Sequence, residues 1–270
     1  MKTRIIAAAV LLPLLLIVVF LLPKVCTAIL FGAMAAVGAY ELMVGTGKVK
    51  ETRLYIYAMI SAFWCALWSG LSISYGWLLL GVLIFWIALF AELMRSQMQL
   101  SFEKMTVSMV AGVIMPLMLS SLVRIHATES GRVLIVIPFV LAFLSDSGAY
   151  FAGLKYGKRK LAPTISPKKT VEGVVGGVIG AVVGMVIYSF VIQSCFHFRV
   201  NYMYATLYGV LGSVAGVFGD LCFSAIKRQV DIKDYGNLIP GHGGILDRFD
   251  SMILIGPLAE ILLLILPMAV

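Results

Sequence analysis

The sequence predicts an all-α, polytopic integral membrane protein with about nine transmembrane helices. Of its 270 residues, 61% are hydrophobic and only 13% are charged, and the mean hydropathy is +1.02. The charges also leave several uncharged runs of about 20 residues, the length that a helix rising ~1.5 Å per residue needs to cross a bilayer core of ~30 Å. This composition is typical of membrane proteins.

The expected spans follow these apolar runs along the chain. The first run is long for a signal peptide and no clear cleavage site follows it, so we expect it to be retained as a span. A polar turn at 72–76 divides the longest run into the third and fourth spans. The runs are residues 5–23, 25–40, 54–91, 105–123, 133–154, 173–198, 200–219 and 251–270.

We expect a single membrane domain over residues 1–270. Residues 1–124 would form a helical scaffold with lipid contact, and residues 132–270 would carry the functional site. Glycines recur at every fourth position in the seventh and eighth spans, which predicts that these two helices pack closely together. These glycines are Gly176, Gly180 and Gly184 in one span, and Gly212 and Gly216 in the other.

The basic residues predict the orientation in the membrane. If the N-terminus is cytoplasmic, the opposite side receives only four of the 21 lysines and arginines, namely Lys24, Arg124, Arg132 and Arg199. This bias predicts a multi-pass protein of the cell inner (plasma) membrane with a cytoplasmic N-terminus. The net charge of +8 requires no nucleic-acid partner, because cytoplasmic loops beside anionic lipid are basic.

The most informative stretch is residues 224–250, SAIKRQVDIKDYGNLIPGHGGILDRFD, which places four carboxylates and four cations in an otherwise apolar chain. Ionisable groups at membrane depth are costly, so such a cluster predicts a functional site. The simpler alternative is an interfacial loop whose charges pair with one another. If the eighth helix continues to residue 229, one of its faces carries Asp220, Ser224, Lys227 and Arg228. The oxygen ligands on this face suit Mg²⁺, and its two cations suit phosphate.

The glycine-rich loop 239–244 cannot form a regular helix. Its glycines allow a ligand to approach the backbone closely, and successive N–H groups can bind an anion. Asp247 and Asp250 follow on one helix face, at i and i+3. In the expected topology, five acids from four helices lie at one depth beneath the inner surface: Asp146, Glu172, Asp220, Asp247 and Asp250.

A second basic patch precedes the seventh span. Lys168 and Lys169 lie at the positive end of the helix dipole, which suits a polyphosphate. An ordinary basic loop beside the membrane explains these two lysines equally well.

Several segments of the C-terminal half resemble the phosphatidate cytidylyltransferases (CDP-diacylglycerol synthases). Residues 145–151 and 166–173 are similar to two family motifs, with Ser147 at a position where we expect threonine in many relatives. Residues 1–124 match only in general character. The longest resemblance is the family signature, Ser224-x-Ile226-Lys227-Arg228, Lys233-Asp234-x-Gly236 and Ile239-Pro240-x-His242-Gly243-Gly244-Ile245-x-Asp247-Arg248-Phe249-Asp250.

This resemblance implies a Mg²⁺-dependent transfer of CMP from CTP to phosphatidic acid at the cytoplasmic membrane face, giving CDP-diacylglycerol and pyrophosphate. Asp220 and Asp247 would be the metal ligands, with Asp250 or Asp146 in support. A second metal or a monovalent cation is an open alternative, with Ser224 as a ligand. The phosphate-binding residues would be Lys168, Lys169, Lys227, Arg228, Lys233 and Arg248. The other substrate-binding residues would be Asp234, His242, Gly243, Gly244 and Glu172, with the His242 loop lining the nucleotide pocket.

Two alternatives remain open at this stage. Another lipid-head-group transferase is one, but a CDP-alcohol phosphotransferase would require an Asp-Gly-x-x-Ala-Arg segment, and the sequence contains no Asp-Gly pair. A transporter of anionic lipid is the other, although paired repeats with broken helices in both halves would be typical of it. The sequence leaves the acyl-chain preference open, and also whether the protein forms a homo-oligomer.

Overall fold

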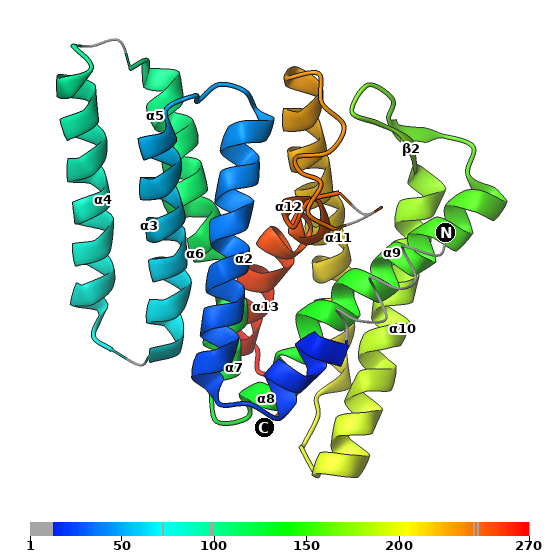
Figure 1. Cartoon of the computed structure of the whole chain (residues 1–270). Helices are drawn as coiled ribbons and strands as arrows, with labels where there is room; N and C mark the ends of the chain where they lie inside the picture. The colour runs from blue at the N-terminus through cyan, green and yellow to red at the C-terminus, as the bar shows by residue number, and fades with distance from the viewer. Residues whose placement is uncertain (1–12, 72, 98–99, 240, 242, 270) are drawn as a thin grey trace. The chain divides into compact units, whose positions relative to one another are not determined.

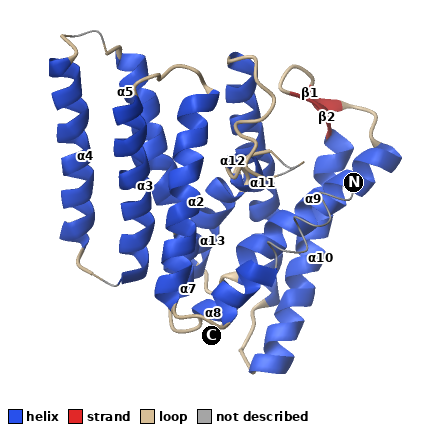
Figure 2. Ribbon diagram, in the orientation of Figure 1, coloured by secondary structure: helices blue, strands red, loops and turns tan. Residues whose placement is uncertain are grey.

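The computed structural model describes residues 13–71, 73–97, 100–239, 241 and 243–269. These residues are mainly helical, with one two-stranded hairpin (Figure 2). The helices are α2 (Lys24–Gly45), α3 (Thr52–Leu71), α4 (Tyr75–Arg95), α5 (Phe102–Met109), the π-helix η1 (Val110–Ile114), α6 (Met115–Leu119), α7 (Ser121–Ala127), α8 (Gly131–Leu134), α9 (Val136–Tyr156), α10 (Val171–Phe196), α11 (Tyr202–Gln229), α12 (Leu246–Phe249) and α13 (Met252–Ile265). The strands are β1 (Lys160–Ala162) and β2 (Ser166–Thr170).

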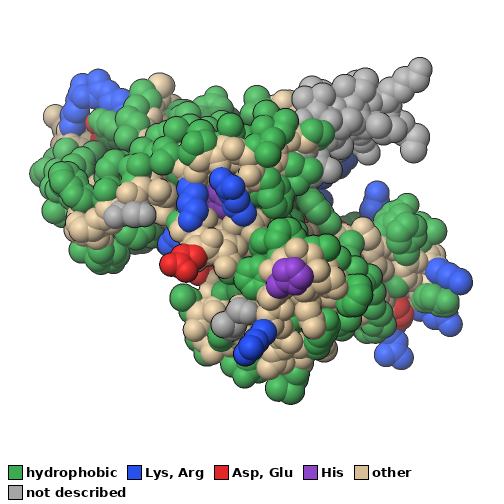
Figure 3. Space-filling model, turned by 90° about the horizontal axis from the view of Figure 1, so that it is seen from below, with side chains coloured by type: hydrophobic (Ala, Val, Ile, Leu, Met, Phe, Trp, Pro, Cys, Tyr) green, Lys and Arg blue, Asp and Glu red, His purple; other side chains and the backbone are tan. Residues whose placement is uncertain are grey.

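The predicted all-α membrane class is confirmed, but the count of nine spans is not. Within the described residues, seven helical segments are long and apolar enough to cross a membrane. Residues 5–12 of the first predicted span lie outside the described residues, and residues 13–20 are helical. The ninth corresponds to α13, whose 14 residues reach only about 21 Å at ~1.5 Å per residue. Exposed large hydrophobic side chains recur along the long helices, for example Leu83 and Ile87 of α4 and Ile179 of α10, as expected for surfaces that meet lipid. Figure 3 views the molecule from below, where hydrophobic side chains lie among a few Lys, Arg and His side chains.

The chain divides into two compact units. The first unit comprises Met1–Glu129 and Ile226–Phe249, and the second comprises Ser130–Ala225 and Asp250–Val270. The first unit therefore combines the N-terminal helices with most of the signature segment. The expected assignment of the site to residues 132–270 of a single domain stays a prediction.

In the first unit, α2 lies beside α3, and α3 lies beside α4 (Figure 1). The predicted polar turn is confirmed, because α3 ends at Leu71 and α4 begins at Tyr75. Small residues let the helices approach closely. A Cβ on Gly70 would lie 2.4 Å from that of Ala28, and a Cβ on Gly81 would lie 2.3 Å from the Trp64 ring.

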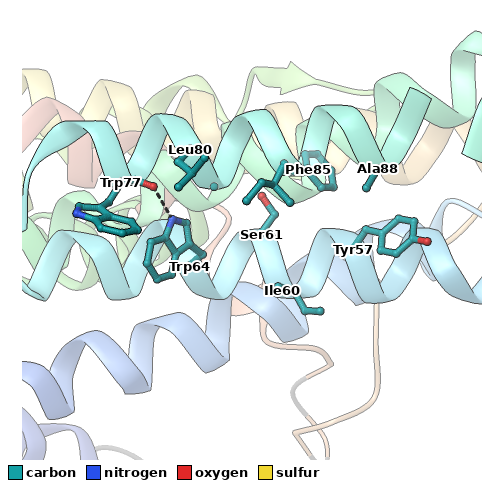
Figure 4. A pocket seen from close by; sticks show the side chains of 10 residues that line it. Tyr57, Ile60, Ser61, Trp64, Trp77, Leu80, Phe85 and Ala88 are labelled. Carbon is teal, nitrogen blue, oxygen red and sulfur yellow. Dashed lines mark hydrogen bonds between the residues drawn. The ribbon is translucent and has the colours of Figure 1, made fainter. Parts of the chain in front are cut away.

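An apolar cavity of about 460 Å³ lies between α3 and α4 (Figure 4). The Trp64 indole nitrogen donates to the Trp77 carbonyl oxygen at 3.1 Å beside this cavity. Among the described residues that line it, Ser61 and Tyr57 supply the only side-chain hydroxyls, and none is charged. The cavity therefore cannot neutralise a phosphate group.

In the second unit, α9 and α10 lie side by side (Figure 1), and glycines line their contact. A Cβ on Gly148 of α9 would lie 2.4 Å from the carbonyl oxygen of Gly176 in α10, and one on Gly180 would lie 2.5 Å from that of Leu144. The predicted α10 ridge therefore packs on α9, whose Gly148 provides the complementary gap. The predicted close packing of the seventh and eighth spans is confirmed at another glycine, because a Cβ on Gly209 of α11 would lie 2.6 Å from the Cα of Val182 in α10.

The β1–β2 hairpin was not predicted. Its strands pair antiparallel, with Lys160 opposite Thr170 and Ala162 opposite Ser166. Thr170 ends the hairpin and begins α10, because its hydroxyl oxygen accepts a hydrogen bond from the Gly173 N–H at 3.1 Å. The hairpin thus fixes Lys168 and Lys169 just before a long apolar helix.

Candidate active site

A buried ion pair organises the signature segment of the first unit. Lys227, on the last turn of α11, donates from Nζ to Oδ1 of Asp247 at 2.9 Å, and their side chains are 10% and 2% exposed. Asp247 Oδ2 accepts the N–H groups of Tyr235 at 2.9 Å and Gly244 at 3.0 Å. One carboxylate therefore joins the end of α11 to both sides of the irregular loop, and its charge is offset by Lys227 and two N–H dipoles.

A residue that the sequence analysis missed completes this arrangement. Glu41, in the last turns of α2, is buried, and its two carboxylate oxygens accept the N–H groups of Ile245 at 3.0 Å and Leu246 at 2.8 Å. The loop 239–244 was predicted to offer successive N–H groups to a ligand anion, and this stays a prediction. The successive N–H groups at 244–246 bind the protein's own carboxylates, those of Asp247 and Glu41. A single acid directly after the uncharged run 25–40 was the available signal.

A polar cavity of about 650 Å³ opens beside this loop. It brings together four predicted site residues, because Lys233, Asp234, Gly243 and Arg248 all line it. Asn237, Ile239 and Gly241 complete the lining. Gly241 and Gly243 have positive φ angles of 77° and 85°, which glycine adopts without strain. Two cations and one acid give the cavity a net positive lining, as an anionic ligand requires.

A second polar cluster lies in the second unit. Lys169 Nζ lies 2.5 Å from Asp220 Oδ2, and the Ser224 hydroxyl donates to Asp220 Oδ1 at 3.0 Å. The predicted continuation of the eighth span to Gln229 is confirmed, and it places Asp220 and Ser224 one turn apart on α11. The Lys169 and Asp220 side chains are 25% and 33% exposed, so solvent and ligands can reach this pair.

The remaining predicted residues lie in varied surroundings. Glu172 accepts the N–H groups of Lys158 at 3.0 Å and Arg159 at 3.2 Å, so its carboxylate closes the hairpin onto α10. Arg228 donates to the Ile232 carbonyl oxygen at 3.0 Å, and Asp250 accepts from the Ser251 N–H at 2.8 Å. Asp146 is exposed on α9 and Lys168 is exposed on β2. His242 lies outside the described residues. Asp220 and Asp247 belong to different units, so their shared metal site and the convergence of the five acids stay predictions.

Comparisons with known proteins identify the family. The sequence model of the cytidylyltransferase family matches residues 2–266. A phosphatidate cytidylyltransferase of Bacillus subtilis (strain 168) is 46% identical over 124 residues, which are 46% of this chain and 45% of the relative. One from Staphylococcus haemolyticus (strain JCSC1435) is 40% identical over 140 residues, 52% of either chain. The chain spans about half the length of these curated relatives. Because the family model extends over nearly the whole sequence, the chain belongs to the cytidylyltransferase family.

Proposed function

We propose that this protein transfers CMP from CTP to phosphatidic acid, giving CDP-diacylglycerol and pyrophosphate. The observation that carries the proposal is the cavity lined by Lys233 and Arg248 beside the buried Lys227–Asp247 pair. The names of the relatives from Bacillus and Staphylococcus support it, as do helices apolar enough to hold a lipid substrate in the bilayer.

The proposed chemistry matches the charges of the cavity. An oxygen of the phosphatidate phosphate attacks the α-phosphorus of CTP, the bond from that phosphorus to the bridging oxygen breaks, and pyrophosphate leaves. Such phosphoryl chemistry depends mainly on positioning and charge neutralisation, so no protein nucleophile is required. Lys233 and Arg248 would bind phosphate oxygens, with arginine as a bidentate donor and lysine as a point charge.

The Asp220 cluster fits a magnesium ion. It offers a partly exposed carboxylate and a neighbouring hydroxyl, and Mg²⁺ usually takes one or two carboxylates together with substrate phosphates and water. Among the described residues, no three His, Cys, Asp or Glu side chains gather as a metal cage. Asp220 and Ser224 would hold the ion, whose charge would neutralise the triphosphate. Lys169 would then turn to a phosphate oxygen.

Asp247 fits a metal less readily than Asp220 does. Its Oδ2 already accepts two N–H groups, and its Oδ1 accepts from Lys227. Oδ1 keeps a second lone pair beside the Lys227 contact, but a metal bound there would lie next to the buried Lys227 ammonium group, and the two positive charges would repel each other. The role of Asp247 as a second metal ligand therefore remains a proposal.

The site is proposed to face the cytoplasm, where CTP is available. The distribution of basic residues supports this orientation, with Lys158 inside and His197 outside. Single cysteines replacing Lys158 or His197, in a variant without the four native cysteines, can be labelled with an impermeant thiol reagent. Labelling of Lys158→Cys from outside intact cells would reverse the orientation.

The activity itself is tested with the purified full-length chain in lipid–detergent micelles. Pyrophosphate release should require CTP, phosphatidic acid and Mg²⁺ together, and the lipid product should carry the cytidine label. A Lys233→Gln variant should raise the KM for CTP by roughly tenfold, whereas Lys50→Gln, outside the site, should not. Label transfer to an alcohol acceptor, or pyrophosphate release without phosphatidic acid, would reject the proposed reaction.

A further inference from the structure

Glu41 is a buried acid near the end of an apolar helix, and the proposed reaction gives it no direct role. Its carboxylate binds two consecutive backbone N–H groups, those of Ile245 and Leu246, across more than 200 positions of sequence. A carboxylate that accepts two N–H groups holds them at a fixed separation and orientation. The contact therefore fixes one short piece of backbone.

That piece of backbone carries the residues of the proposed nucleotide site. Ile245 is held on both sides, because its N–H binds Glu41 and its carbonyl oxygen accepts the N–H groups of Arg248 at 3.0 Å and Phe249 at 3.2 Å. Arg248 lines the polar cavity, and Asp247 pairs with Lys227. A shift at Ile245 would therefore move both side chains.

The loop glycines are shaped around the Glu41 carboxylate. A Cβ on Gly236 would lie 2.4 Å from Glu41 Oε1, and one on Gly244 would lie 2.4 Å from each of its carboxylate oxygens. No side chain fits at either glycine while Glu41 keeps its place. Two signature glycines thus make room for an acid of α2, outside the signature.

We infer that Glu41 is a positioning residue for the proposed nucleotidyl transfer, acting through the backbone of Ile245 and Leu246 on Arg248 and Asp247. This inference rests on the proposed function. A merely structural anchor would change the amount of folded protein, whereas a positioning residue changes the kinetic constants of the folded enzyme.

Three variants of the full-length chain test this inference. Glu41→Gln keeps the size of the side chain, but its amide has one oxygen, so one of the two N–H groups faces an NH₂ donor. Gly236→Ala keeps the charge of Glu41 and displaces its carboxylate. Glu92→Gln is the matched control, because Glu92 lies on α4 with a side chain 16% exposed and pairs with Arg53 at 3.6 Å, away from the loop.

Two measurements are made on each variant. Hydrogen exchange reports the backbone at 244–249 directly and requires no activity. Glu41→Gln and Gly236→Ala should each speed exchange there by roughly tenfold and leave α9 and α10 unchanged. Steady-state kinetics per folded enzyme should show kcat/KM for CTP lowered by about tenfold or more, with the KM for phosphatidic acid unchanged. Glu92→Gln should match the wild type in both measurements.

The outcomes separate the inference from the proposed function. Faster exchange at 244–249 together with the CTP-specific loss supports the inference. Faster exchange without the kinetic change overturns it, since the contact would then be an anchor only, and a kinetic loss without faster exchange overturns it as well. If the wild type itself turns over no CTP, the proposed function fails and the positioning role fails with it, while the exchange data still report the contact.

Discussion

Each unit of the molecule contains a lysine–aspartate ion pair, and the two pairs differ in burial. In the first unit, the side chains of Lys227 and Asp247 are 10% and 2% exposed, and the carboxylate accepts two backbone N–H groups as well. In the second unit, the side chains of Lys169 and Asp220 are 25% and 33% exposed, and a serine hydroxyl is the additional donor.

This difference separates two roles that one residue type can serve. A buried carboxylate surrounded by donors costs free energy to disturb, because each donor would be left without a partner in a poorly solvated place. A partly exposed carboxylate can exchange a lysine or a hydroxyl for water, a metal or a phosphate-bound ion at little cost. We therefore expect Asp247 to hold the loop together and Asp220 to exchange ligands during the reaction.

The largest effect should follow from Asp247→Asn. The substitution leaves Lys227 buried without its anion and places an NH₂ group against N–H donors, so the free energy of unfolding should fall by about 3 kcal/mol. Turnover should fall by roughly 10³ or more, because Arg248 and the cavity shift with the loop. Denaturant unfolding and pyrophosphate release measure the two effects. If the variant is inactive but as stable as the wild type, Asp247 acts as a metal or substrate ligand and does not hold the loop together.

Asp220→Asn should lose as much activity as Asp247→Asn, but its stability should be nearly that of the wild type. The partly exposed ion pair with Lys169 contributes at most about 1 kcal/mol, so the unfolding transition should move little. Turnover should fall by roughly 10³, and added Mg²⁺ should restore part of it if the ion binds more weakly. An Asp220→Asn protein with normal turnover would remove Asp220 from the proposed metal site.

The double variant tests whether the two aspartates serve one step. If both act on the same metal-assisted step, the double variant should be little worse than either single variant, because residues that act as a unit are not additive. Multiplicative losses of activity would assign them to separate steps.

The spans were predictable because they depend on local sequence alone. The break between α3 and α4 and the end of α11 at Gln229 follow from polar residues that interrupt or extend apolar runs. The hairpin escaped prediction because its strands have three and five residues, and Glu172 closes it by binding N–H groups 13 and 14 positions away. The run 105–123 was predicted as one continuous span, whereas the structure interrupts it with the π-helix Val110–Ile114.

The site residues that lie close together in the signature could be predicted from the sequence, whereas the contact between residues far apart in the sequence could not. Lys233, Asp234, Gly243 and Arg248 lie within 16 positions of one another and line one cavity. Glu41 lies 204 positions from Ile245, and no local pattern relates the two. The same contact changes the interpretation of Gly244. This glycine was predicted to let a ligand approach the backbone closely, and the structure shows the Glu41 carboxylate at that place.

The two lysines of β2 should differ in their effect on the KM for CTP, and both effects should be smaller than the losses of turnover above. Lys169 pairs with Asp220, whereas Lys168 is exposed, so Lys169→Gln should raise the KM for CTP by about tenfold, and Lys168→Gln by about twofold or less. The KM for phosphatidic acid should change less than that for CTP in both variants. If the two substitutions change the KM for CTP equally, Lys168 and Lys169 belong to an ordinary basic loop, in which their positions within the hairpin do not matter.

The smallest effect on stability should come from the ion pair of Lys48 and Glu103, which is more exposed than either lysine–aspartate pair. Lys48 Nζ lies 3.1 Å from Glu103 Oε1, and their side chains are 46% and 61% exposed. Glu103 also lies in the first turn of α5, where a negative charge is favourable, so Glu103→Gln should cost about 0.5 kcal/mol of unfolding free energy. High salt should reduce even this difference, because water and ions screen an exposed pair. Turnover should match the wild type, since neither residue lines the polar cavity. A loss of stability as large as that of Asp247→Asn would show that burial does not rank the ion pairs of this protein, and would remove the basis for assigning Asp220 and Asp247 different roles.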